Sequence, residues 1–217
     1  MSVILFDLDG TLVDTAHDLG AALNIQLERH GKASLTHEMI RPIASHGSRG
    51  LLEIGFNLSP ADSDFLAMRE EYLTIYEDVL THSPILFDGM QEVLSAIENN
   101  GMQWGVVTNK PKRFTTRIIK AMQLDQRAAC VISGDDAPRP KPYPDTLLMA
   151  CKLMNAQAEN CIYIGDAARD IEAGQAAGMR TAVALYGYLG EMDDPAGWGS
   201  DFMVEQPVDI LKLISFN

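Results

Sequence analysis

Near its N-terminus the chain carries a short apolar run that ends in two carboxylates. Residues 3–9 read Val-Ile-Leu-Phe-Asp-Leu-Asp. A run this short and this apolar is typical of a strand that is buried on both faces of a parallel sheet. Ligands of open α/β sheets bind beyond the carboxyl ends of such strands. The run therefore predicts an α/β protein with a site where Asp7 and Asp9 follow the first strand.

The next seventy residues interrupt this pattern. They show amphipathic helical periodicity and no comparable apolar strand, and the spacing of Leu19, Leu23 and Leu27 illustrates it. We predict that a helical cap, residues 15–83, is inserted into a core formed by residues 1–14 and 84–217. The cap helices are expected over residues 16–30, 36–44, 48–56 and 61–81.

After residue 84 apolar strands and helices alternate along the chain. Repeated βα units of this kind predict a Rossmann-like parallel sheet that is covered by helices on both faces. The strands are expected over residues 103–108, 129–133, 160–165, 180–185 and 201–204. The helices are expected over residues 89–100, 112–122, 144–154 and 168–177, with one more at the C-terminus.

Charge and composition exclude several classes of partner. The formal net charge is −13, which disfavours binding to nucleic acid or to an acidic membrane surface. No apolar run is long enough to span a bilayer. The cysteines at 130, 151 and 161 lack the spacing of metal or redox sites, so we expect buried thiols in a reducing cytoplasm. We expect a cytoplasmic monomer or weak homodimer.

Polar side chains follow three further strands of the predicted sheet. Thr108 and Asn109 end the second strand, and Lys141 lies between two prolines after the third. Asp166 follows the fourth strand, with Asp170 one helical turn later. Because the carboxyl ends of parallel strands meet at one edge, we expect these side chains to converge on Asp7 and Asp9.

This set of residues suits phosphoryl transfer. Hard oxygen ligands and the lack of a Cys or His cluster favour Mg²⁺ over zinc, held by Asp7, Asp9 and Asp166. Thr108 and Lys141 are expected to hold the phosphate oxygens. Asp9 is placed to protonate the leaving alkoxide and then to activate water against an aspartyl-phosphate on Asp7.

The strings Asp-Leu-Asp-Gly-Thr, Thr-Asn, Lys-Pro and Gly-Asp-x-x-x-Asp, in this order, resemble the four motifs of the haloacid dehalogenase superfamily. The resemblance implies Asp7 as nucleophile and Asp9 as acid/base. It implies a metal bound by Asp7, the Asp9 backbone carbonyl and Asp166, with Asp170 supporting the site from outside the ligand set. The helical insertion resembles the small helical cap of that family.

Shorter strings resemble one branch of the superfamily. Residues 104–111, the Tyr186-Gly187-Tyr188 string and Trp198-Gly199 are similar to the phosphoglycolate phosphatase-like branch. They are most similar to bacterial members that dephosphorylate N-acetylmuramic acid 6-phosphate. The substrate implied is therefore a small phosphorylated metabolite, either that sugar phosphate or 2-phosphoglycolate.

A polar loop in the predicted cap, residues 46–50, resembles the cap segment that reads the substrate in this family. Gly47, Ser48 and Arg49 of this loop, with Asn109 of the core, are the candidate substrate-binding residues. Arg49 could bind a substrate carboxylate as a planar fork, or it could be a surface arginine. Lys110, which follows Asn109, could help to attract the anion or could face water, and we favour the interpretation that it faces water.

Two other functions remain open from the sequence. The chain could be a phosphoglucomutase-like phosphotransferase of the same superfamily, or a non-catalytic binding protein on this fold. A dehalogenase is disfavoured, because that chemistry needs no metal, whereas the Asp9 carboxylate beside Asp7 suits a metal-assisted phosphatase.

Overall fold

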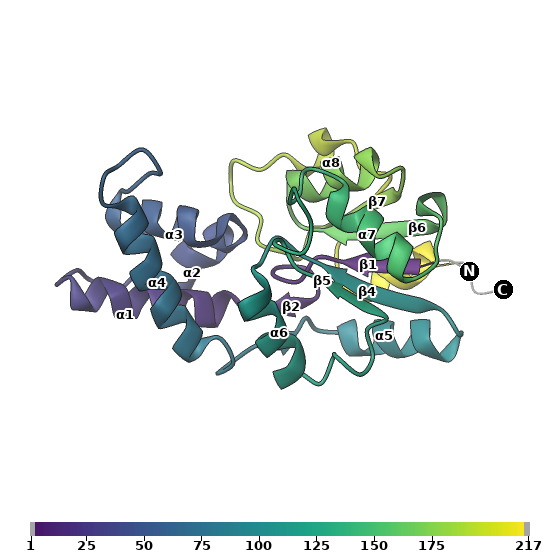
Figure 1. The fold of residues 1–217 in the computed structure, drawn as a ribbon, viewed down its shortest axis with the longest axis horizontal. Coiled ribbons are helices and arrows are strands. Elements are labelled where there is room, and N and C mark those ends of the chain that lie inside the picture. The colour runs from purple at the N-terminus through teal and green to yellow at the C-terminus, as the bar shows by residue number, and fades with distance from the viewer. Residues whose placement is uncertain (1–2, 215–217) are drawn as a thin grey trace.

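The core of the molecule is a parallel sheet of six strands (Figure 1). The structure is a computed structural model and describes residues 3–214. Every neighbouring pair of strands in this sheet is parallel, which confirms the predicted α/β fold. In the order in which they lie side by side, the strands are β5 (Cys130–Ile132), β4 (Gln103–Val107), β1 (Val3–Phe6), β6 (Cys161–Gly165), β7 (Arg180–Ala184) and β8 (Phe202–Val204).

Side chains of the central strand alternate between the two faces of the sheet. Ile4 and Phe6 belong to one buried cluster, and Val3 and Leu5 belong to the other. The first cluster includes side chains of α5 and α6, and the second includes side chains of α7 and α8. A strand buried on both faces needs this continuous apolar sequence. The bounds are α5 (Met90–Asn99), α6 (Lys112–Ala121), α7 (Asp145–Leu153) and α8 (Ala168–Ala176).

Four α-helices stand apart from the sheet at one end of the molecule (Figure 1). They are α1 (Ala16–Arg29), α2 (His37–Ile40), α3 (Gly47–Phe56) and α4 (Phe65–Val79). The chain leaves the core through β2 (Val13–Asp14) and returns through β3 (Ile85–Leu86), which pair antiparallel. The division of the chain into a core and a cap over residues 15–83 is a proposal that rests on this arrangement.

Two predicted helices differ in type from those observed. The helix predicted over 36–44 ends as an α-helix at Ile40 and continues as the 3₁₀ helix η1 (Arg41–His46). Pro42 has no backbone N–H, so it cannot donate the α-helical hydrogen bond four residues back. The predicted C-terminal helix is the 3₁₀ helix η4 (Pro207–Leu213), which begins with proline.

The cysteines have the surroundings that the sequence predicts. Cys130, Cys151 and Cys161 are free and buried. Within residues 3–214, none of the helices has the length and apolar character needed to cross a membrane.

Candidate active site

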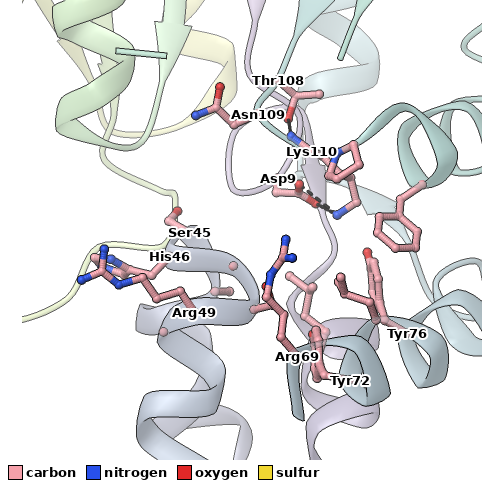
Figure 2. Close-up of a pocket in the computed structure, with 18 of the residues that line it drawn as sticks. Asp9, Ser45, His46, Arg49, Arg69, Tyr72, Tyr76, Thr108, Asn109 and Lys110 are labelled. Carbon is pink, nitrogen blue, oxygen red and sulfur yellow. Dashed lines mark hydrogen bonds and ion pairs between the residues drawn. The ribbon is translucent and has the colours of Figure 1, made fainter. Parts of the chain in front are cut away.

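A pocket of about 610 Å³ lies between the carboxyl edge of the sheet and the helices of the cap (Figure 2). Its core side includes Asp7 and Asp9, which follow β1, and residues 108–111, which follow β4. Its cap side includes residues 44–50 and one face of α4. The carboxyl ends of neighbouring parallel strands thus meet at one place, where ligands of such sheets bind.

Asp7 lies at the base of this pocket beside a buried lysine. The Lys141 Nζ is 3.0 Å from Asp7 Oδ1 and 2.7 Å from Asp170 Oδ1, and the lysine side chain is fully buried. Lys141 also donates to the Tyr163 hydroxyl (2.6 Å) and to the carbonyl of Val107 (3.2 Å). One ammonium group therefore joins β4 and β6 to Asp7, which follows β1, and to Asp170 of α8.

Burial dominates the electrostatics of Asp7. It raises the pKa of the Asp7 carboxyl above its usual value, although the Lys141 ammonium acts in the opposite direction. The backbone N–H of Leu8 donates to Asp7 Oδ1 (2.7 Å) and orients the carboxylate. The Asp7 side chain is 5% exposed, so a reacting group can reach it only from the pocket.

Asp166 follows β6 and is held from several directions. Its Oδ2 accepts hydrogen bonds from the Ser45 hydroxyl (2.7 Å) and from the Tyr188 N–H (2.9 Å). Burial, together with the nearby Asp170 and Asp7 carboxylates, raises the pKa of Asp166 to about 7. Gly10 has a φ of +82°, and a Cβ there would lie 2.1 Å from Asp166 Oδ2. Only glycine lets the chain turn this close to the carboxylate.

The carboxylates of Asp7, Asp166 and Asp170 fit a divalent cation. One oxygen from each lies within 4.8 Å of the others, and all three residues are buried. Oxygen donors of this type suit Mg²⁺. Mutual repulsion contributes to the raised pKa of Asp166, and a cation would relieve that repulsion. Asp170 contacts Lys141 through Oδ1 and accepts the Ala167 N–H at Oδ2, whereas Asp7 contacts Lys141 and Leu8 through Oδ1 alone. Asp7 and Asp166 are therefore the better candidates for direct ligands.

Asp9 points away from this acidic group. Its carboxylate lies 2.8 Å from the Nζ of Lys110 and accepts a hydrogen bond from the Thr15 hydroxyl. The interpretation of Lys110 as a solvent-facing residue is therefore wrong, because its side chain is only 6% exposed. Its Nζ also lies 4.9 Å from the centre of the Tyr76 ring, which is on α4. Lys110 thus connects Asp9 with the cap (Figure 2).

The two residues that precede Lys110 have different surroundings. Thr108 is buried, lines the pocket and accepts a hydrogen bond from the N–H of Lys110 at its hydroxyl (3.1 Å). Asn109 also lines the pocket, but its amide exchanges two 2.9 Å hydrogen bonds with the backbone of Lys141. The amide of Asn109 therefore fixes the loop that carries Lys141, a role that the sequence did not indicate.

The cap loop predicted to read the substrate forms one wall of the pocket. Gly47, Ser48 and Arg49 all line it, and Gly47 begins α3 with a φ of +60°. The Arg49 side chain is exposed and extends away from the pair of Asp9 and Lys110 (Figure 2). Beside this loop, the Arg169 guanidinium donates to the carbonyl of Ser45 (2.9 Å).

Several residues of the site were missed from the sequence. Tyr163 resembled any apolar residue of β6, and Ser45 and Arg69 resembled surface residues of helices. Arg169 lies inside the Gly-Asp-x-x-x-Asp string, so its position was a usable signal. The others carried no signal of their own, because their partners are distant in sequence.

The pKa of Asp166 leads to a testable stability prediction. Between pH 4 and pH 7 the folded protein keeps a proton on Asp166 that the unfolded chain has lost, so this group lowers stability as the pH rises. In metal-free buffer we expect Asp166→Asn to be more stable than the wild type at pH 8, by up to about 4 kcal/mol. Urea unfolding with a chelator at pH 8 and pH 5 measures this difference, which should shrink at pH 5. An equal difference at both pH values would contradict it.

The chain is similar to known proteins over most of its length. The family model described as haloacid dehalogenase-like hydrolase matches residues 4–184. The N-acetylmuramic acid 6-phosphate phosphatase of Pseudomonas putida is 40% identical over 99% of this chain and 96% of its own. A phosphoglycolate phosphatase of Xanthomonas campestris is 42% identical over 94% of this chain and 92% of its own. A crystal structure described as a predicted phosphoglycolate phosphatase from Haemophilus somnus superimposes with a TM-score of 0.84 at 24% identity, covering 98% and 97% of the two chains.

Proposed function

This chain belongs to the haloacid dehalogenase-like hydrolases, and we propose that it is a magnesium-dependent phosphatase of N-acetylmuramic acid 6-phosphate. Its relatives are named as phosphatases of small phosphorylated molecules, and this chain is a phosphatase of that class. The metal, the residues and the substrate are our proposal. It rests above all on Asp7, a buried carboxylate that lines the pocket. Asp7 lies beside Lys141 and forms an acidic cluster with Asp166 and Asp170.

In the proposed first step Asp7 attacks the phosphorus atom of the substrate. A bond forms between a carboxylate oxygen of Asp7 and phosphorus, and the bond from phosphorus to the sugar oxygen breaks. Thr108 lines the pocket directly after β4, and the Lys141 ammonium lies 3.0 Å from Asp7, so these two residues are the proposed phosphate-binding groups. When bound, a Mg²⁺ ion would neutralise charge between Asp7, Asp166 and the phosphate.

Asp9 is the proposed proton carrier. It gives a proton to the departing sugar oxygen, and it later removes one from the water that hydrolyses the aspartyl-phosphate. The products are the alcohol and inorganic phosphate, and Asp7 is regenerated. To reach the leaving oxygen, Asp9 must exchange its contacts with Lys110 and Thr15 for the substrate.

The size of the pocket favours the larger of the two substrates. A pocket of about 610 Å³ lies within the range of about 300–1,000 Å³ that holds drug-sized ligands. An acetylated sugar phosphate with a lactyl ether fills such a space better than a two-carbon acid. The relative named for N-acetylmuramic acid 6-phosphate also covers nearly the whole of this chain.

A comparison of substrates tests the proposal. We expect kcat/KM with Mg²⁺ to be at least about tenfold higher for N-acetylmuramic acid 6-phosphate than for 2-phosphoglycolate, since that ratio needs only about 1.4 kcal/mol of extra binding. A chelator should remove the activity, and added Mg²⁺ should restore it. Faster release from 2-phosphoglycolate would contradict the choice of substrate.

The same assay distinguishes the other functions. A phosphotransferase of the phosphoglucomutase type would need a sugar bisphosphate and would release little free phosphate. A binding protein would release none from any ester, including p-nitrophenyl phosphate. A cytoplasmic location and a monomeric or weakly dimeric state remain predictions.

A further inference from the structure

Arg69 of α4 is a cation of the pocket without a carboxylate partner in the part of the chain that the structure describes. It lies on the same helix face as Tyr72, Leu73 and Tyr76, which also line the pocket at the spacing of successive helical turns. Among residues 3–214, no Asp or Glu oxygen lies within 4.0 Å of its guanidinium. In a protein with a net charge of −13, an unpaired guanidinium that lines a pocket points to an anionic ligand.

The orientation of this guanidinium is set by the cap loop. Arg69 Nε donates to the Ser48 hydroxyl at 3.1 Å, which leaves both Nη groups for another partner. Figure 2 shows the guanidinium directed into the pocket, toward Asp9 and Lys110. Two Nη groups held side by side match the two oxygens of a carboxylate.

On the proposed function, the phosphate of the substrate lies at Asp7, on the other side of the pocket. Asp7, Thr108 and Lys141 come from the core, whereas Arg69 and Ser48 come from the cap. A substrate that extends from one wall to the other therefore needs a second anionic group to meet Arg69. On the proposed function, that group is the lactyl carboxylate of N-acetylmuramic acid 6-phosphate.

We propose that Arg69, and not Arg49, binds the substrate carboxylate and thereby selects lactyl-substituted sugar phosphates. This inference rests on the proposed function and adds a residue that determines its specificity. Arg49 is the weaker candidate, because its side chain is exposed and extends away from Asp9 and Lys110. Arg69 is half-buried, and Ser48 already holds it in place.

The test compares two sugar phosphates that differ only in the lactyl ether. N-acetylmuramic acid 6-phosphate carries it, and N-acetylglucosamine 6-phosphate does not. We expect Arg69→Gln to lower kcat/KM for the first by about 100-fold, as for loss of one partner of a desolvated charge pair, and for the second by less than about threefold. Arg69→Lys should fall between, because lysine keeps the charge without the fork.

Two further variants make the comparison specific. Arg29→Gln is the matched control, since Arg29 is a cap arginine on α1 that does not line the pocket. Its kinetics on both sugars should equal those of the wild type. Arg49→Gln should lose less than Arg69→Gln on the lactyl sugar. If Arg49→Gln shows the larger selective loss, or if Arg69→Gln slows both sugars equally, the proposal is overturned.

A binding measurement separates this proposal from the proposed function. Calorimetry with unphosphorylated N-acetylmuramic acid and N-acetylglucosamine needs no turnover. Preferential binding of the acid that Arg69→Gln abolishes supports the proposal even if the enzyme fails to hydrolyse the phosphorylated sugar. Preferential binding of the acid that survives in a folded Arg69→Gln variant overturns the proposal.

Discussion

Asp7→Asn is expected to lower kcat for p-nitrophenyl phosphate by at least about 10⁴-fold, as for the loss of a catalytic nucleophile. The asparagine amide has the shape of the carboxylate and can still accept the hydrogen bond from Leu8, but its oxygen does not attack phosphorus. The activity assay, run with saturating Mg²⁺, measures the loss directly.

The same substitution should leave the fold intact. Burial raises the pKa of the Asp7 carboxyl, so its charge opposes folding at neutral pH, and the neutral amide removes that cost. We therefore expect the midpoint of urea unfolding in chelator to be equal to that of the wild type or higher. Asp125→Asn, at an exposed carboxylate outside the pocket, is the matched control and should change neither measurement. A rate above one tenth of the wild type in a folded Asp7→Asn would exclude Asp7 as the nucleophile.

Lys141→Met is expected to remove activity and to destabilise the protein by about 3–5 kcal/mol at pH 8. The methionine leaves the buried carboxylates of Asp7 and Asp170 without their shared cation. The Lys141 charge now opposes the rise in the pKa of Asp7, so its loss raises that pKa further. A raised carboxyl pKa makes the folded state bind protons more tightly, so the variant should regain stability as the pH falls from 8 to 6. Urea unfolding at these two pH values measures both effects.

Two other variants show whether charge is the cause. Lys152→Met, at an exposed lysine of α7, should change the stability by less than about 0.5 kcal/mol. Adding Asp170→Asn to Lys141→Met should recover part of the stability at pH 8 while the activity stays absent. If Lys141→Met unfolds at the same urea concentration as the wild type at both pH values, the ammonium does not balance these carboxylates.

The fold was predictable because its signals are local. The apolar run at Val3–Phe6 indicates a strand buried on both faces, and the alternation after residue 84 indicates a parallel sheet. The error in the helix predicted over 36–44 also has a local cause. Pro42 ends the helix predicted over 36–44 by removing one backbone donor, and this follows from the residue type alone.

The core of the candidate site was predictable for a different reason. Asp7, Thr108 and Asp166 each come directly after a strand, and the topology of a parallel sheet places those strand ends at one edge. No local rule places Lys110 against Asp9, or Ser45 against Asp166. The first pair depends on how the loops after β1 and β4 turn, and the second on how η1 sits over the sheet, and both are set by packing between distant segments.

The sequence alone determined that a group of carboxylates and one lysine gather at the end of a parallel sheet. It could do so because backbone periodicity and strand ends are local properties. The tertiary structure decided which side chains share a charge and which remain unpaired. Lys141 serves both Asp7 and Asp170, Asn109 holds the loop of Lys141, and Arg69 is left facing the pocket without a carboxylate partner among residues 3–214. Such pairings depend on distances of a few ångströms between chain segments, and electrostatic and hydrogen-bond energies change steeply over that range.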